Sequence, residues 1–279
     1  MNPEPQRLTC GEISASARRR LLSVRGEPLF LADWDRAVFL HYEVDPAALQ
    51  AAVPFCLDLL DGRAYLSLVA FTLRDLRPRV GGRLGAWLFR RIATHEFLNM
   101  RAYVRHRNEP GIYFLAEWLS NPLSVRLGPP AFGLPYRPGT IDYHHIHERG
   151  ELRGSVEAAD RFCALRYHAT VPPDAPFVPC PHGTLDEFLL ERYTAFTCHQ
   201  SRRGFFRIWH PPWPQVRIDP SVSDHTLLEE NWPWFRDARL IGGNYSHGVR
   251  DVWMGRPHRT RPGSPANSSG TLSTFFEFP

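Results

Sequence analysis

The chain has 279 residues, of which 43% are hydrophobic and 13% aromatic, and its formal net charge is +4. This apolar content is enough for a sizeable core, and a single all-β domain commonly reaches this length. No apolar run approaches the roughly 20 residues of a membrane-spanning helix, which excludes such a helix and predicts no membrane partner.

Both ends of the chain are polar, and we expect them to be flexible. Residues 1–25 contain the one dense basic run, Arg18–Arg20, and no apolar signal-peptide segment follows it. No DNA- or RNA-binding motif accompanies this run, so we expect no nucleic-acid partner. We therefore predict a flexible arm over residues 1–25, a single domain over residues 26–256 and a flexible tail over residues 257–279.

The first element signals lie between residues 45 and 71. Residues 45–54 are typical of a short helix, with aspartate as N-cap, proline at the first helical position and a second proline that ends it. An Asp-Gly turn at 61–62 leads into the β-rich apolar run 64–71. The glycine-rich stretch 81–85 lacks a phosphate-binding pattern, and we interpret it as a loop.

Residues 96–118 show the clearest strand pattern. Apolar and polar side chains alternate over 96–105, an Asn-Glu-Pro-Gly turn follows at 108–111, and an apolar run returns over 112–118. We predict an antiparallel hairpin within a closed sheet.

The alternation leaves open which face of this hairpin is the interior. Glu96 shares one face with apolar side chains, and if that face is inside, its carboxyl is suited to acid or base chemistry. The opposite face carries Asn99, Arg101 and Tyr103. If this second face is inside, Arg101 is suited to bind an anion. The remaining interpretation is an ordinary surface or a structural Arg–Glu pair.

The His-His-Ile-His segment at 144–147 is the strongest candidate for metal binding, because His145 and His147 share a face if the segment is a strand. An exposed hairpin end is an equally natural interpretation of this segment. Zinc needs about four ligands, and no further ligand set is evident, so we predict no metal. No dinucleotide, Walker or nucleophile-elbow motif is present, and we predict no cofactor. The five cysteines are far apart and form no CxxC pair, which fits a reducing cytoplasm.

The second half of the chain continues with short elements. Residues 162–171 are a strand candidate, and a Thr-Leu-Asp-Glu capping box starts a helix over 183–193. A hairpin over 195–209 and a rigid Pro-Pro turn that packs Trp213 on the core come next. Many short strands with few short helices predict a mainly β (α+β) fold, closed or sandwiched.

One residue and eight short segments share a characteristic order and spacing. They are Trp34 with 44–46 and 53–54, then 61–69, 97–104, 111–114, 134–136, 191–193 and 210–213. Together, over about residues 28–220, they resemble the uncharacterised YqjF-like family (domain-of-unknown-function family 2071), a relative of acetoacetate decarboxylase. The resemblance implies an acetoacetate decarboxylase-like closed β-barrel or cone with a few short flanking helices.

The decarboxylase relatives carry a Gly-x-Pro-Lys-Lys segment, whose first lysine forms a Schiff base and whose second lowers the pKa of the first. The resemblance aligns this segment with residues 133–137 and implies Tyr136 at the nucleophile position and Arg137 at the helper position. It also likens Glu96 to an active-site glutamate. All 33 Lys+Arg residues are arginine, so no side-chain amine can form an imine here.

We therefore predict a small-molecule pocket for an organic acid, in which Glu96 and Tyr136 supply any catalytic acid–base chemistry. The candidate ligand-binding residues are Arg101, Arg137, Asn99, Tyr103 and His210. An enzyme of this kind would carry out a lyase- or hydrolase-type reaction on a small carboxylate. The alternative is a non-catalytic ligand-binding or interaction protein that uses the same cavity. We expect a cytoplasmic protein, and the sequence is compatible with a homo-oligomer.

Overall fold

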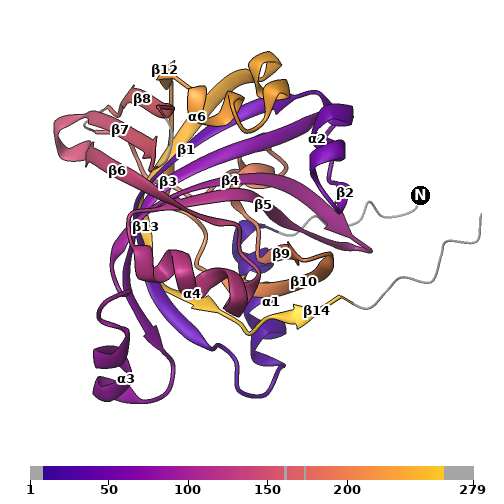
Figure 1. Cartoon of the computed structure of the whole chain (residues 1–279), viewed down its shortest axis with the longest axis vertical. Helices are drawn as coiled ribbons and strands as arrows, with labels where there is room; N and C mark the ends of the chain where they lie inside the picture. The colour runs from indigo at the N-terminus through magenta and orange to yellow at the C-terminus, as the bar shows by residue number, and fades with distance from the viewer. Residues whose placement is uncertain (1–8, 160–161, 173, 261–279) are drawn as a thin grey trace, which may run out of the picture.

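The computed structural model describes residues 9–159, 162–172 and 174–260, and strands dominate it (Figure 1). All named strands join one 14-stranded sheet. The strands are β1 (Phe30–Val44), β2 (Cys56–Leu57), β3 (Ala64–Pro78), β4 (His95–His106), β5 (Glu109–Leu119), β6 (Tyr136–Ile146), β7 (Glu151–Ala158), β8 (Ala164–Thr170), β9 (Thr194–His199), β10 (Arg202–Trp209), β11 (Gln215–Ile218), β12 (Ser221–Asp224), β13 (Arg239–Met254) and β14 (His258–Arg259). The mainly β prediction is confirmed.

The helices are short and lie around the sheet (Figure 1). They are α1 (Cys10–Leu22), α2 (Pro46–Ala52), α3 (Gly82–Phe89), α4 (Pro122–Phe132), α5 (Leu185–Leu190) and α6 (Thr226–Glu229), with the 3-10 turns η1 (His147–Arg149) and η2 (Pro233–Asp237). None of the helices in the described ranges is both long enough and apolar enough to cross a lipid bilayer.

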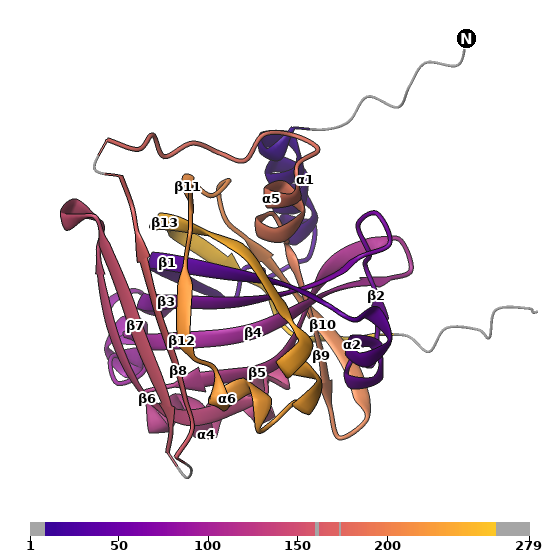
Figure 2. The ribbon, with the colours of Figure 1, turned by 90° about the horizontal axis from the view of Figure 1, so that it is seen from above.

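The sheet closes on itself. Pairing of β4 with β5 joins the two ends of the path β5-β9-β10-β13-β1-β3-β4 into a ring. The strands β6, β7 and β8 leave this ring at the edge of β5 and form a second layer over β1, β3 and β4 (Figure 2). Closure matters for function because a closed ring encloses an interior that its inward-facing side chains can line.

The ring strands are buried on both faces. On the outer face, Leu98 and Met100 of β4 share one core with Leu152 of β7 and Leu165 of β8. On the inner face, Phe97 of β4 belongs to a second core. The alternation of β4 therefore separates two apolar environments, and the odd-numbered residues 97–103 face the interior of the ring.

Several local predictions are confirmed. The hairpin over 96–118 is β4 and β5, paired antiparallel from Phe97 with Leu119 to His106 with Glu109, and a bulge lies between residues 100 and 101. The short helix after residue 45 is α2, where the Asp45 carboxylate accepts a hydrogen bond of 2.8 Å from a backbone N–H. The strand over 162–171 is β8, and the hairpin over 195–209 is β9 and β10.

The N-terminal arm is the clearest error in the fold prediction. Residues 10–22 form α1, which a reciprocal capping box between Thr9 and Glu12 starts. Leu21 is fully buried, and the Ser14 hydroxyl donates a 2.8 Å hydrogen bond to the carbonyl of His210. The expected flexible arm is thus wrong for these residues, whereas residues 1–8 and 261–279 lie outside the described residues. Within the expected tail, 258–259 form β14.

Two further helices correct the sequence interpretation. The stretch 81–85, expected to be a loop, begins α3, and α4 follows β5 without having been predicted. Gly85 lets α3 lie close to the end of β3, because a Cβ there would stand 2.8 Å from the Pro78 side chain. Helix α5 ends at Leu190, earlier than the predicted 193.

Thr184 caps α5, and we expect Thr184→Ala to lower the free energy of unfolding by about 1 kcal/mol. Its hydroxyl oxygen accepts a 3.3 Å hydrogen bond from the Glu187 N–H, which alanine cannot replace. Denaturant titration measures the change, and Thr184→Ser is the matched control because it keeps the hydroxyl. An unchanged midpoint for Thr184→Ala would count against the capping role.

Candidate functional site

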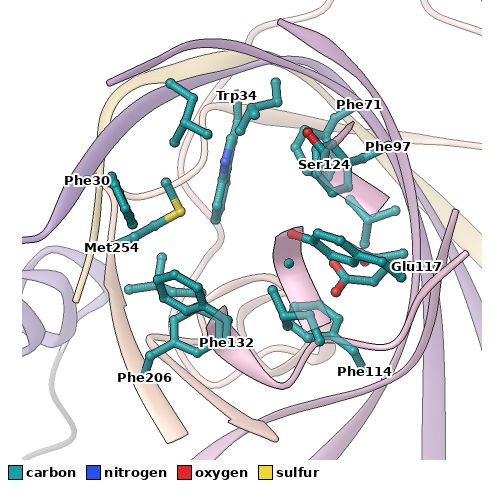
Figure 3. A pocket seen from close by; sticks show the side chains of 18 of the residues that line it. Phe30, Trp34, Phe71, Phe97, Phe114, Glu117, Ser124, Phe132, Phe206 and Met254 are labelled. Carbon is teal, nitrogen blue, oxygen red and sulfur yellow. The ribbon is translucent and has the colours of Figure 1, made fainter. Parts of the chain in front are cut away.

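The interior of the ring contains a cavity of about 370 Å³. Side chains from the surrounding strands point into it, as Figure 3 shows, and α4 lies along one side. Aromatic rings make up much of the wall, and they belong to Phe30, Trp34, Phe71, Phe89, Phe97, Phe114, Phe132, Tyr136, Phe206 and Trp213. This volume and this apolar lining are typical of small-molecule sites.

A row of polar side chains crosses three neighbouring strands within this wall. Asn99 of β4 is the register partner of Glu117 of β5, and Glu117 is the register partner of Tyr136 of β6. All three residues line the cavity. Side chains directly opposite each other on adjacent strands lie within contact distance, so the row forms one polar patch.

Glu117 is the most unusual member of this row. The residue is 4% exposed, and its Oε2 atom has no hydrogen-bond partner among the described residues. Burial raises the pKa of Glu117 to about 8, so the carboxyl is largely protonated at neutral pH. Its carboxyl group points into the cavity (Figure 3), where a protonated acid can donate a hydrogen bond to a ligand.

Tyr136 stands beside Glu117 and keeps its proton. Burial, and then the nearby Glu117 carboxyl, raise the pKa of Tyr136 well above its ordinary value. Its ring meets Phe97 edge to face at 5.8 Å. Helix α4 can pack closely on the aromatic ring of Tyr136 because residue 128 is glycine. A Cβ at this position would lie 2.1 Å from the tyrosine ring. The phenol is therefore a rigidly held hydrogen-bond donor.

Arg101 brings a positive charge to the cavity wall. It is 6% exposed, and its Nη2 atom donates a 2.8 Å hydrogen bond to the carbonyl of Leu189. Among the described residues no carboxylate oxygen lies within 4.0 Å of its guanidinium, and its Nε has no hydrogen-bond partner. The other arginine in the wall, Arg192, differs because it pairs with Asp58 at 2.7 Å.

The charge of Arg101 affects the pKa of Glu191, although the two side chains form no ion pair. Burial raises the pKa of Glu191 to about 7, against the lowering effect of Tyr193, the backbone of Trp213 and Arg101. Its carboxyl oxygens accept hydrogen bonds from the Tyr193 hydroxyl and, at 3.0 Å, from the Trp213 N–H. This carboxyl therefore leaves the positive charge of Arg101 incompletely balanced.

The two histidines in the cavity wall, His95 and His210, add no charge. Burial is the main cause that lowers the pKa of each to about 4. His210 donates from Nδ1 to the carbonyl of Pro211 at 2.8 Å, which fixes its tautomer, because a carbonyl can only accept. Arg101 and Arg192 are consequently the cationic groups of the wall.

Two predicted site residues lie on the opposite face of the sheet. Glu96 is on the outer face of β4, where it lines a different cavity beside β6 and accepts a 2.8 Å hydrogen bond from Ser120. Arg137 follows Tyr136 on β6 and so points to the opposite face, where it donates to Asn231 at 2.6 Å and lies over Trp118. The expectation that Glu96 and Tyr136 share a cavity is wrong, because strand alternation separates them.

Tyr103 faces inward but does not line the cavity. Its hydroxyl lies 2.5 Å from Ser67 Oγ and donates to the Leu189 carbonyl at 2.9 Å. The same carbonyl accepts the hydrogen bond from Arg101, so Tyr103 supports the position of that guanidinium. Asn99, Arg101, Tyr136 and His210 do line the cavity as candidates for ligand contact, and Glu117 is the member that sequence reasoning missed.

The histidine segment at 144–147 is held by hydrogen bonds. His145 is buried, with Nδ1 2.7 Å from the Arg36 carbonyl and Nε2 2.7 Å from the Tyr167 hydroxyl. His147 Nδ1 lies 2.9 Å from the hydroxyl of Tyr245. In the part of the chain that the structure describes, no three His, Cys, Asp or Glu side chains are grouped to hold a metal ion.

The fold is acetoacetate decarboxylase-like, because solved structures of that fold match most of the chain. An acetoacetate decarboxylase-like enzyme from Sphingomonas wittichii RW1 is 16% identical, with a TM-score of 0.59 over 84% of this chain and 94% of that one. Acetoacetate decarboxylase from Legionella pneumophila is 13% identical, with a TM-score of 0.56 over 93% and 92%. The enduracididine biosynthesis enzyme MppR is 13% identical, with a TM-score of 0.59 over 83% and 89%.

The particular family follows from the sequence match. Residues 31–236 match the family model DUF2071, described as an uncharacterised conserved protein, and the chain belongs to this family. The uncharacterised protein YqjF of Bacillus subtilis is 30% identical over 200 residues, which cover 70% of this chain and 78% of YqjF. The resemblance inferred from the short segments is thereby confirmed.

Proposed function

We propose that the cavity binds a small organic acid, with the carboxylate at Arg101 and the apolar part among the aromatic rings. The observation that carries this proposal is the buried guanidinium of Arg101, which lines the cavity and has no carboxylate within 4.0 Å among the described residues. A buried charge without a carboxylate partner is costly, and a bound carboxylate would supply that partner together with charge-assisted hydrogen bonds.

The polar row suggests how the rest of such a ligand is held. Asn99, protonated Glu117 and Tyr136 offer neutral hydrogen-bonding groups to a carbonyl or hydroxyl of the acid. A carboxyl with a pKa of about 8 is also suited to general-acid chemistry near neutral pH. A lysine Schiff-base route is excluded because the sequence contains no lysine. MppR, which shares the fold, has been obtained in complex with pyruvate, itself a small organic acid.

The second candidate function is ligand binding without catalysis in the same cavity. The apolar wall favours it, because binding needs only the guanidinium and the aromatic rings. Turnover of the bound acid distinguishes the two functions. A bound acid that is recovered chemically unchanged after long incubation indicates a binding protein, whereas its conversion indicates an enzyme.

Isothermal titration against a panel of short aliphatic and aromatic acids tests the proposal. We expect saturable binding in which each acid binds about 10- to 100-fold more tightly than its primary amide, because a charged hydrogen bond contributes about 1.5–3 kcal/mol. The amides are matched controls, since they keep the shape and lose the charge. Equal affinity for acids and amides would contradict a carboxylate site at Arg101.

A further inference from the structure

Exposed apolar side chains gather on α3 and α4. Of the ten large hydrophobic residues that are exposed in the described part of the chain, five belong to these two helices and a sixth lies two residues before α3. They are Val80 (75% exposed), Leu84 (67%), Trp87 (55%), Leu88 (64%), Leu123 (40%) and Leu127 (46%). Helix α3 projects away from the strand ring, at the lower left of Figure 1.

The positions of these residues define a face of α3. Leu84, Leu88 and Trp87 are related by spacings of three and four residues, which places them on one side of the helix. Arg83, Arg90 and Arg91 flank this side. A short helix with Trp and Leu on one side and arginines beside them is typical of segments that lie in a membrane interface.

The charge around this face is strongly one-sided. Segments 76–95 and 120–134, which contain the two helices, carry six arginines and no Asp or Glu. Arg83, Arg91 and Arg126 form no ion pair with any described residue. A second copy of the chain would bring these like charges together, whereas an anionic lipid surface would neutralise them. We call Val80, Leu84, Trp87, Leu88, Leu123, Leu127, Arg83, Arg91 and Arg126 the basic apolar patch.

Carboxylates do occur on one flank of α3, and two of the three are engaged in ion pairs. Asp33, Asp75 and Asp251 line a groove with Ala86 and Arg90 of the helix. Asp251 pairs with Arg77 at 2.8 Å, and Asp33 pairs with Arg250 at 2.9 Å. The patch itself keeps its net positive charge.

The cavity reaches the surface beside this patch. Leu127 and Ala131 of α4 both line the cavity and are exposed, so the cavity opens next to them. Phe89, the last residue of α3, and Ile92, which lies three residues after the helix, line it as well. An apolar molecule leaving a lipid layer under the patch would meet the aromatic wall without crossing water.

We propose that the basic apolar patch docks the protein on an anionic lipid surface, from which an apolar-tailed acid enters the cavity. The docking part of the proposal depends only on the patch, whereas delivery of the acid rests on the proposed function. The sequence predicted no membrane partner because no segment can span a bilayer, but docking of this kind only needs side chains that enter the headgroup region.

Vesicle co-sedimentation of the full chain tests the docking. We expect binding to vesicles of phosphatidylcholine mixed with phosphatidylglycerol, little binding to phosphatidylcholine alone, and release by added salt. Leu84→Ser with Trp87→Ser should lower the partition coefficient more than about tenfold. Arg83→Gln and Arg91→Gln should each lower it about fivefold.

Two exposed residues away from the patch provide matched controls. Leu59→Ser removes an exposed leucine and Arg202→Gln an exposed arginine, and both should bind vesicles like the parent chain. Absence of binding to the anionic vesicles, or an equal loss in the controls, would overturn the docking. The docking would also be overturned if a patch variant changed only the oligomeric state, measured by sedimentation velocity, and not vesicle binding. Carboxylate affinity measured without vesicles should be unchanged in the patch variants, so failure of docking and failure of the cavity proposal are distinguishable.

Discussion

Replacing Arg101 with glutamine should weaken binding of small acids about 100-fold while the protein stays folded. The guanidinium lines the cavity and has no carboxylate partner among the described residues, so the ligand would lose its charge-assisted hydrogen bonds. Stability should not fall, because removal of an unpaired buried charge relieves a desolvation cost. Calorimetric titration and thermal unfolding measure the two effects.

Arg137→Gln is the matched control for this variant. Arg137 is also partly buried, but it donates to Asn231 on the opposite face of the sheet and lies outside the cavity. Its replacement should therefore leave the affinity for acids unchanged. If Arg137→Gln weakened binding as much as Arg101→Gln, or if Arg101→Gln had no effect, the carboxylate site would not be at Arg101.

The alternation of residues 96–105 was enough to predict β4 but not which face encloses the cavity. Both faces of the strand are buried, since β7 and β8 cover the outer one, so polarity alone could not choose between Glu96 and Arg101. The choice depends on ring closure, which joins strands far apart in the sequence through a few pairs such as Ile112 with Ala195. No local pattern encodes that contact.

Glu117 was missed because its strand was interpreted only as an apolar return of the hairpin. A single carboxyl in the run 112–118 was nevertheless a readable signal, since an acid on a buried strand needs a partner or a raised pKa. The capping box of Thr9 and Glu12 was equally readable as the start of α1. In both cases the interpretation followed the overall polarity or apolarity of the segment, although one residue within it indicated otherwise.

The resemblance located Tyr136 in the cavity wall but not Arg137. Adjacent residues of a strand point to opposite faces, and the segment 136–146 is a strand from its first residue. The resemblance therefore predicts the location of the first lysine position, Tyr136, correctly. The second position, Arg137, does not lie in the same cavity. The acidic group beside Tyr136 comes from Glu117 on the neighbouring strand.

We expect Glu117→Gln to stabilise the fold increasingly as pH rises from about 4.5 to about 8. Burial raises the pKa of Glu117 from 4.5 to about 8 in the folded chain. Between these values the unfolded chain has released the proton and the folded chain still holds it, so the parent protein loses stability as pH rises. The loss is about 1.4 kcal/mol for each pH unit in this window, and glutamine, which does not ionise, removes it.

Thermal unfolding of the parent and the variant at pH 5 and pH 8 tests this prediction. The difference in stability between the two proteins at each pH reports on this carboxyl alone, because both proteins share the other titrating groups. The gain should be small at the lower pH and large at the higher one. Glu96→Gln is the matched control, because it removes a carboxyl of the same hairpin that lies outside the cavity. A gain that does not depend on pH, or a loss at pH 8, would mean that folding does not raise the pKa of Glu117, so that its carboxyl is ionised at neutral pH. In that case it could not donate a hydrogen bond to a bound acid, and the acid–base part of the proposal would fail while the carboxylate site at Arg101 would remain.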